Sequence, residues 1–129
     1  MLGQSALYLT AIILGAMIFF SFVVAPTTIK LLDEENSRKF IRGIFPFYYL
    51  LNLILSFVAC VLFYLNENLS IDFLLMVSVS VLFAISNFIL MPMINKFRDN
   101  NEDKKFKISH FISVFINFIQ LIFLVIILL

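Results

Sequence analysis

Four long segments without a charged side chain restrict this chain to the membrane. They cover residues 1–29, 43–66, 73–95 and 108–129. Each is longer than the roughly 20 residues that an α-helix needs to cross a hydrocarbon core of about 30 Å. A water-soluble domain of 129 residues, 63% of them hydrophobic, could not bury so much apolar surface. The pattern predicts an all-α integral membrane four-helix bundle, a single domain over residues 1–129 with helices at about 5–29, 44–66, 73–95 and 108–129.

The positions of the nine basic residues predict the orientation of the helices. Four of them fall in loop 30–42 and five in loop 96–107, whereas the connection 67–72 has none. Loops rich in Lys and Arg stay on the cytoplasmic side of a membrane. We therefore expect both basic loops in the cytoplasm, both termini outside, and a location in a bacterial inner membrane. The N-terminus shows no cationic segment and no cleavage site, so we expect the first helix to be retained.

The two halves of the chain resemble each other at an offset of 66 residues. Seven of the 26 positions in 21–46 are identical to their counterparts, among them the pairs Pro26 and Pro92, and Lys30 and Lys96. A chance match in a chain rich in Phe and Lys is the alternative. A true duplication would give two hairpins that run out, in and out again, a parallel internal repeat about an axis along the membrane normal.

Each predicted helix carries one polar residue at a similar distance from a basic loop. These four residues are Ser21, Asn52, Asn87 and Asn117. Each lies nine or ten positions from the nearest Lys or Arg, which is about 14–15 Å along a helix and near the middle of the bilayer. Ser113 and the only histidine, His110, share a face of the last helix with Asn117. The layer either joins helices through hydrogen bonds or lines a pocket for a ligand. The candidate polar site comprises Ser21, Asn52, Asn87, Asn117, Ser113 and His110.

Further candidates lie near the basic loops, on the expected cytoplasmic face: Pro26, Arg42, Pro46, Pro92 and Asn95. Pro46 suits the first turn of a helix, where its missing N–H costs nothing.

Two other features of the spans concern helix packing and the lipid interface. Tyr48 and Tyr49 are expected in the aromatic belt at the interface. Ala11 and Gly15 are spaced to let another helix approach closely.

The residues in the spans favour a protein that is not an enzyme. No Asp, Glu, Lys or Arg falls in a span, which argues against a proton- or sodium-coupled relay and a drug antiporter. A single Cys60 excludes a disulfide framework and a cysteine metal site. No catalytic residue, metal or cofactor is predicted.

Two kinds of function fit these residues. We expect an accessory subunit or a small transport- or stress-related component, forming a homo-oligomer or joining other membrane subunits in the lipid bilayer, without nucleic acid. The alternative is a haem- or cofactor-binding oxidoreductase-type subunit that uses His110 as a ligand.

Four short motifs carry a resemblance to a known family. They are Gly15 with Phe19-Phe20, Phe22-Val23 and Pro26; Gly43 with Phe45-Pro46-Phe47-Tyr48; Asn87 with Pro92; and Phe106 with His110, Ser113 and Asn117. With these motifs the chain resembles the transmembrane protein 205-like family, also described as bacterial domain of unknown function 4149. Ile13 and Phe111 depart from it, since members often have Trp and Gly there. The resemblance implies a four-span integral membrane protein without a settled biochemical activity.

Overall fold

The structure is a computed structural model that describes residues 1–129, and all of its regular elements are helical. In chain order they are α1 (Leu2–Phe19), η1 (Phe20–Val24), α2 (Ala25–Leu31), α3 (Glu34–Leu65), α4 (Ile71–Ile85), η2 (Ser86–Leu90), α5 (Met91–Asp99) and α6 (Asp103–Leu128). The π-helical turns η1 and η2 continue their neighbours, so the chain forms four long helices. Each is long and apolar enough to cross a membrane. The predicted all-α four-helix architecture is confirmed.

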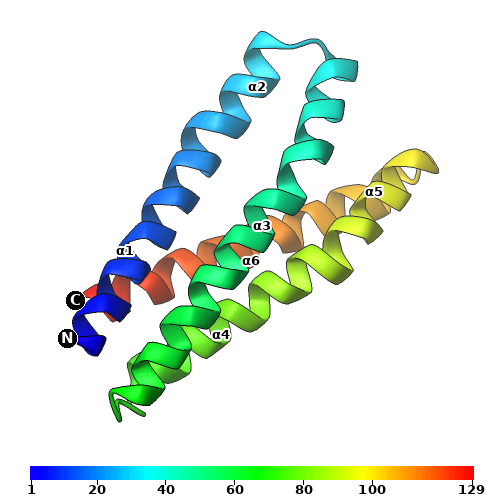
Figure 1. The fold of residues 1–129 in the computed structure, drawn as a ribbon. Helices are drawn as coiled ribbons and strands as arrows, with labels where there is room; N and C mark the ends of the chain where they lie inside the picture. The colour runs from blue at the N-terminus through cyan, green and yellow to red at the C-terminus, as the bar shows by residue number, and fades with distance from the viewer.

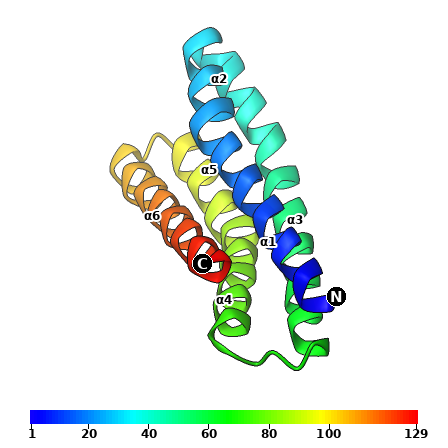
Figure 2. The same cartoon turned by 90° about the vertical axis from the view of Figure 1, so that its left-hand side faces the viewer.

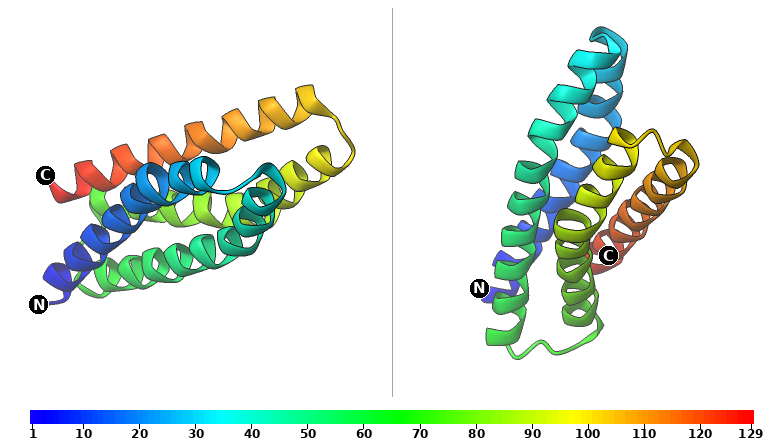
Figure 3. Two further views of the ribbon diagram at one scale, coloured as in Figure 1. Left: turned by 90° about the horizontal axis from the view of Figure 1, so that it is seen from above. Right: turned by 90° about the vertical axis from the view of Figure 1, so that its right-hand side faces the viewer.

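The four helices form a ring in which α1 packs on α3, α3 on α4, α4 on α6, and α6 on α1. Both termini and the α3–α4 connection lie at one end of the bundle, and the other two connections lie at the opposite end (Figures 1 and 2). We call this opposite end the basic end, because every Lys and Arg lies at or near it. The hairpins α1–α3 and α4–α6 therefore run in the same direction, which the view from above also shows (Figure 3).

The helices at the basic end extend further than the sequence predicts. α3 begins at Glu34, because the Asp33 carboxylate caps it by accepting a hydrogen bond from the Asn36 N–H at 2.8 Å. The expected loop 30–42 is therefore wrong for residues 34–42, which are helical. α6 likewise begins at Asp103 rather than near 108. Charged residues propagate a helix into water as readily as apolar residues do in lipid, so hydropathy does not locate these ends.

Because α3 begins earlier than expected, Pro46 occupies a different place within the helix. It lies in the interior of the helix and not in its first turn, so that expectation is wrong. A proline cannot donate to the carbonyl four residues earlier, here that of Arg42. This carbonyl lies close to the charged part of α3, where water can reach it.

Each π-helical turn ends two residues before a proline, Pro26 after η1 and Pro92 after η2. The missing proline N–H and the widened turn both displace the regular hydrogen-bond ladder. The turns begin at Phe20 and Ser86, which are 66 residues apart, the offset of the predicted internal repeat. This recurrence is consistent with two related hairpins.

The interior is small and partly polar, with 24 of 129 residues buried, so most apolar side chains face outward as in a bundle surrounded by lipid. Tyr48 and Tyr49 are buried in this core, and the Tyr48 ring stacks on Phe20 with centroids 4.1 Å apart. Their expected place in an interfacial aromatic belt is therefore wrong. They lie on the face of α3 that also carries Asn52, and this face points inward.

The Ala11 and Gly15 pair faces away from the bundle. Both residues are exposed, and a Cβ added at Gly15 would meet no atom within 4 Å. The close helix approach expected at this pair does not occur within the chain.

Candidate functional site

Two residues of the predicted polar layer form a direct hydrogen bond. The Asn117 Nδ2 group donates to the Ser21 Oγ atom at 3.2 Å. Asn117 belongs to α6, and Ser21 belongs to the π-helical turn η1. Since these segments come from different hairpins, the bond joins the two halves of the bundle near the expected membrane centre.

Two tyrosines from α3 stand beside this bond. The Tyr48 hydroxyl lies near the Ser21 side chain, and Tyr49 lies near Ser113. The Tyr48 hydroxyl is nevertheless buried without a hydrogen-bond partner. Its ring stacks on Phe20, on the inward face of α3.

Two buried side-chain amides form a hydrogen bond through the NH₂ group but none through the oxygen. Asn52 is 0% exposed, and its Nδ2 group donates to the Tyr48 carbonyl oxygen at 3.0 Å. Gln120 is 1% exposed, and its Nε2 group donates from α6 to the Val79 carbonyl oxygen of α4 at 3.0 Å. The oxygens Asn52 Oδ1 and Gln120 Oε1 have no partner. An unsatisfied buried polar atom costs about 1–3 kcal/mol, and lipid offers no substitute for water.

The other predicted layer residues are placed differently. Asn87 is half-buried and forms no side-chain hydrogen bond, while its neighbour Ser86 is buried. His110 is exposed, and its ring lies parallel to that of Phe106 with centroids 5.8 Å apart. The structure therefore brings together Ser21 and Asn117, with the tyrosines and Ser113 beside them, and leaves His110 outside.

Sequence reasoning missed the tyrosines as members of this site. The signal was present, because Tyr48, Asn52 and Ser56 follow one another at intervals of four and share one helix face. Gln120 follows Asn117 by three positions and so shares its helix face. Its bond to a backbone carbonyl of another helix could not be read from spacing.

Ion pairs join the hairpins at the basic end. Arg42 of α3 places Nη2 at 2.6 Å from Asp99 Oδ1 of α5, and it also donates to the Asn95 carbonyl oxygen at 3.4 Å. Arg98 of α5 reaches Glu34 of α3 at 3.3 Å. The hydrogen bond from Arg42 holds the pKa of the Asp99 carboxyl, which lies outside the charge-free segment 73–95, below its ordinary value.

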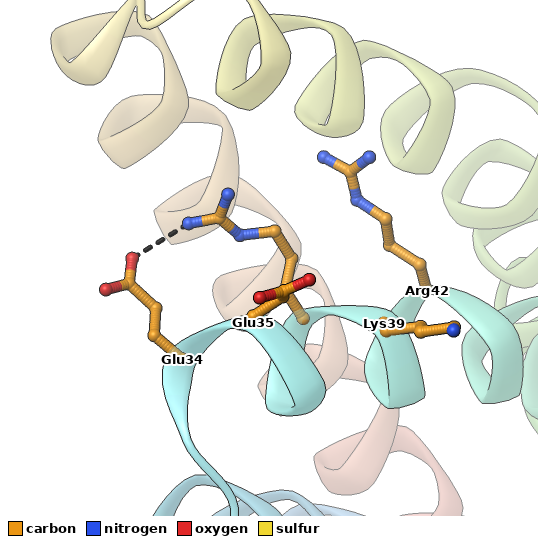
Figure 4. Close-up of a pocket in the computed structure, with 5 residues that line it drawn as sticks. Glu34, Glu35, Lys39 and Arg42 are labelled. Atoms are coloured by element: carbon orange, nitrogen blue, oxygen red, sulfur yellow. Dashed lines mark hydrogen bonds and ion pairs between the residues drawn. The ribbon is translucent and has the colours of Figure 1, made fainter.

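An open hollow on α3 lies next to these ion pairs and is lined only by charged residues: Glu34, Glu35, Arg38, Lys39 and Arg42. Figure 4 shows the ion pair of Glu34 with Arg38, and it shows Arg42 and Lys39 pointing in different directions. Ligand pockets are mostly apolar and concave, so this hollow is a hydrated, charged surface. Among the candidates expected near this face, Arg42 and Asn95 are in contact, and the three prolines are exposed.

The fold and the layer define a small polytopic membrane protein, a four-helix bundle with charge-free spans and polar groups in its interior. The chain belongs to the family described as "Domain of unknown function (DUF4149)", which matches residues 8–103. It is similar to an "Uncharacterized protein" of Aquifex aeolicus (strain VF5), with 31% identity over 112 residues that cover 87% of this chain and 83% of that protein. No solved structure matches the chain. Neither match carries the transmembrane protein 205-like name that the motifs suggest.

The family match ends at the start of α6. The residues that α6 contributes to the site, Ser113, Asn117 and Gln120, lie beyond residue 103. The residues from η1 and α3 lie inside the matched range. The family match therefore covers only one side of the Ser21 to Asn117 contact.

Proposed function

We propose that this protein is a small membrane transport component in which the polar layer between the two hairpins receives a solute. The observation that carries the proposal is the pair of unpartnered buried atoms on one face of α3, Tyr48 Oη and Asn52 Oδ1. Both lie on the α3 face that also places Tyr48 beside Ser21, the hydrogen-bond partner of Asn117. A solute between the hairpins would satisfy them.

A purely structural layer accounts for only part of this arrangement. Hydrogen bonds between membrane helices contribute about 0.6 kcal/mol each, and the Asn117 to Ser21 bond fits that role. Unpartnered groups contribute nothing to helix association and instead destabilise the empty bundle. A bound solute would form hydrogen bonds with the tyrosine hydroxyl and the amide oxygen, which helix packing leaves without partners.

Thiol labelling tests whether the layer is reached by water. In a Cys60→Ser background, Ser21→Cys places a thiol in the layer, and Phe22→Cys places one on the exposed outer surface at the same depth. We expect the small uncharged reagent methyl methanethiosulfonate, which reacts with thiolates and so with thiols in contact with water, to modify the Ser21→Cys protein in vesicles and to leave the Phe22→Cys protein unmodified. A third variant, Lys104→Cys at the basic end, shows that the reagent is active.

The contrary result is equally clear. If the Ser21→Cys protein resists this small uncharged reagent, as the Phe22→Cys protein does, the layer is dry and serves helix packing alone. The transport proposal then fails.

Association with other helices belongs to the same proposal. The face of α1 that carries Ala11 and Gly15 is exposed, and small residues there allow close contact with a helix of a second copy or of another membrane subunit. We expect Gly15→Leu to weaken self-association measured by cross-linking in mild detergent. Equal cross-linking of both proteins would remove this face from the proposal.

The haem alternative gains no support from the geometry. His110 is its proposed ligand, and that ring is stacked on Phe106 at the surface, outside the layer. No group of three or more His, Cys, Asp or Glu side chains comes together in a way that could hold a metal ion.

A further inference from the structure

We infer that the ligand of the polar layer is a small uncharged molecule that donates hydrogen bonds, between water and urea or glycerol in size, an inference that rests on the proposed function. The unpaired atoms of the interior are its receiving groups: Tyr48 Oη, Asn52 Oδ1 and Gln120 Oε1.

The charge of the ligand follows from the charges around the layer. No Asp, Glu, Lys or Arg lies in the charge-free segments. Arg42 is ten residues from Asn52 along α3, about 15 Å away, and it is already paired with Asp99. Burying an ion without a partner costs several kcal/mol even after the protein relaxes. An ionic ligand would meet no compensating charge in this interior.

The hydrogen-bonding character of the ligand follows from which atoms are free. Asn52 and Gln120 each donate one N–H of the side-chain amide to a backbone carbonyl, at 3.0 Å in both cases, whereas their oxygens have no partner. Their free atoms are amide oxygens, and such oxygens only accept hydrogen bonds. The ligand must therefore bring N–H or O–H groups, as water, urea and glycerol do. Ethers and ketones without such groups would leave both oxygens unsatisfied.

The three atoms come from two helices that lie at opposite corners of the ring, α3 and α6. Each of these helices packs on both α1 and α4, so their inward faces share one interior. Tyr48, Asn52 and Gln120 lie six, ten and thirteen residues from Arg42 or Lys107. Along a helix these separations are about 9, 15 and 20 Å. The free polar atoms therefore occur in steps of roughly 5 Å through the middle of the bundle.

Buried hydroxyls continue this polar interior toward the other end of the bundle. Ser56 and Thr10 are both 0% exposed. Each donates to a backbone carbonyl of its own helix, Ser56 to Leu53 at 3.0 Å and Thr10 to Ala6 at 2.8 Å. Each hydroxyl oxygen can still accept a hydrogen bond. A ligand with donor groups finds acceptors beyond Gln120 as well.

The size of the ligand follows from where the hollows are. Two hollows lie on the outside of the bundle, one among the charged residues 34–42 and one on α6 among residues 121–126. The interior is filled by side chains such as Met17, Phe63 and Phe83. A ligand of a few heavy atoms would displace these side chains least, whereas a drug-sized molecule would need a hollow of about 300 Å³ or more.

Solute permeation into proteoliposomes tests the inference. Stopped-flow light scattering follows vesicle volume after mixing with sucrose, urea or glycerol, which reports water, urea and glycerol permeation separately. A fourth arm with potassium chloride reports ions. We expect the protein to raise permeation of at least one neutral molecule above that of protein-free liposomes, with no gain for the salt.

Substitutions tie the permeation to the proposed atoms. Asn52→Leu keeps the volume and removes the acceptor, so we expect it to lower the protein-dependent permeation about two- to tenfold, the effect of one hydrogen bond. Tyr48→Phe removes a single oxygen and is the test variant if Asn52→Leu does not fold. Asn100→Leu makes the same chemical change at an exposed turn and should leave permeation unchanged.

Three results would overturn the inference: no gain for any neutral molecule, a gain for the salt instead, or a gain that persists in both Asn52→Leu and Tyr48→Phe. The thiol-labelling experiment separates this failure from that of the proposed function. Labelled Ser21→Cys without neutral permeation means that the layer is open but receives another class of ligand. Unlabelled Ser21→Cys means that the transport proposal fails with it.

Discussion

Arg42 and Asp99 form an ion pair of 2.6 Å that joins α3 of the first hairpin to α5 of the second. The residues are 57 positions apart in the chain. A second pair, Arg98 with Glu34, runs between the same two helices in the opposite sense, so each helix supplies one cation and one anion. Both pairs are open to solvent and are screened by salt. They fix how the two hairpins are placed at the basic end more than they stabilise the bundle.

The Arg42 and Asp99 pair makes a prediction about pH. The pKa of Asp99 is lowered, first of all by the hydrogen bond from Arg42. A group whose folded pKa is depressed stabilises the fold above its unfolded pKa, about 3.9 for Asp, and this contribution is lost as pH falls through the folded value. We expect the Asp99 carboxyl resonance to titrate at a lower pH in the wild type than in Arg42→Gln. Identical midpoints by NMR in detergent would contradict the pairing.

The hydrogen bond between Asn117 and Ser21 makes a prediction about stability. Because it joins the hairpins inside the membrane, removing either partner should weaken their packing. We expect a coupling free energy of about 0.6 kcal/mol in a double-mutant cycle of Ser21→Ala and Asn117→Leu. Unfolding in mixed micelles with increasing SDS measures it. Strictly additive effects of the two substitutions would show that the bond contributes nothing.

Tyr48→Phe distinguishes an occupied layer from a dry one by the sign of its effect. If a ligand or water satisfies the hydroxyl, removing it loses a hydrogen bond and lowers the free energy of unfolding by about 0.5–1.5 kcal/mol. If the hydroxyl is unpaired, its removal leaves stability unchanged or raises it. We expect destabilisation. Phe45→Leu, which alters packing next to Tyr48 but changes no polar atom, is the matched control.

The end of α3 offers a stabilising substitution. Glu67 has φ 56°, in the left-handed region, just past the helix end. The Asn68 N–H donates to the Phe63 carbonyl at 3.0 Å there, which is the pattern that favours glycine. We expect Glu67→Gly to raise the free energy of unfolding by about 1 kcal/mol.

Asn101 provides the comparison for that substitution. It has the same φ of 56° in the other hairpin, and asparagine tolerates this conformation better than glutamate does. Asn101→Gly should therefore have the smaller effect in the same unfolding measurement. A larger gain at Asn101 than at Glu67 would contradict this explanation.

Reporter fusions test the orientation of the bundle. The distribution of Lys and Arg predicts the basic end in the cytoplasm and both termini outside. We expect alkaline phosphatase fused after Leu129 to be active and a fluorescent cytoplasmic reporter at the same point to be dark. The reverse pattern would invert the topology.

Hydropathy predicts the four spans because a charge-free run of more than 20 residues has few alternatives to a membrane helix. It does not predict the helix ends, since Glu34 to Arg42 continue α3 into water at no cost. Depth along the helices predicts a layer of four polar residues, and two of them, Ser21 and Asn117, form a hydrogen bond. The inward face of Tyr48 could have been read from its spacing to Asn52. The order of the helices in the ring decides which helices face each other. The periodicity of the sequence does not predict this order.

The part of α3 that precedes Pro46 is long enough to amplify a small bend. From Pro46 to Glu34 the helix runs for twelve residues, about 18 Å, with no break. Prolines are where helices bend, and a bend of about 10° at Pro46 would displace the tip at Glu34 by about 3 Å. A small movement beside the buried tyrosines would thus become a sideways displacement of the Glu34 and Arg98 contact.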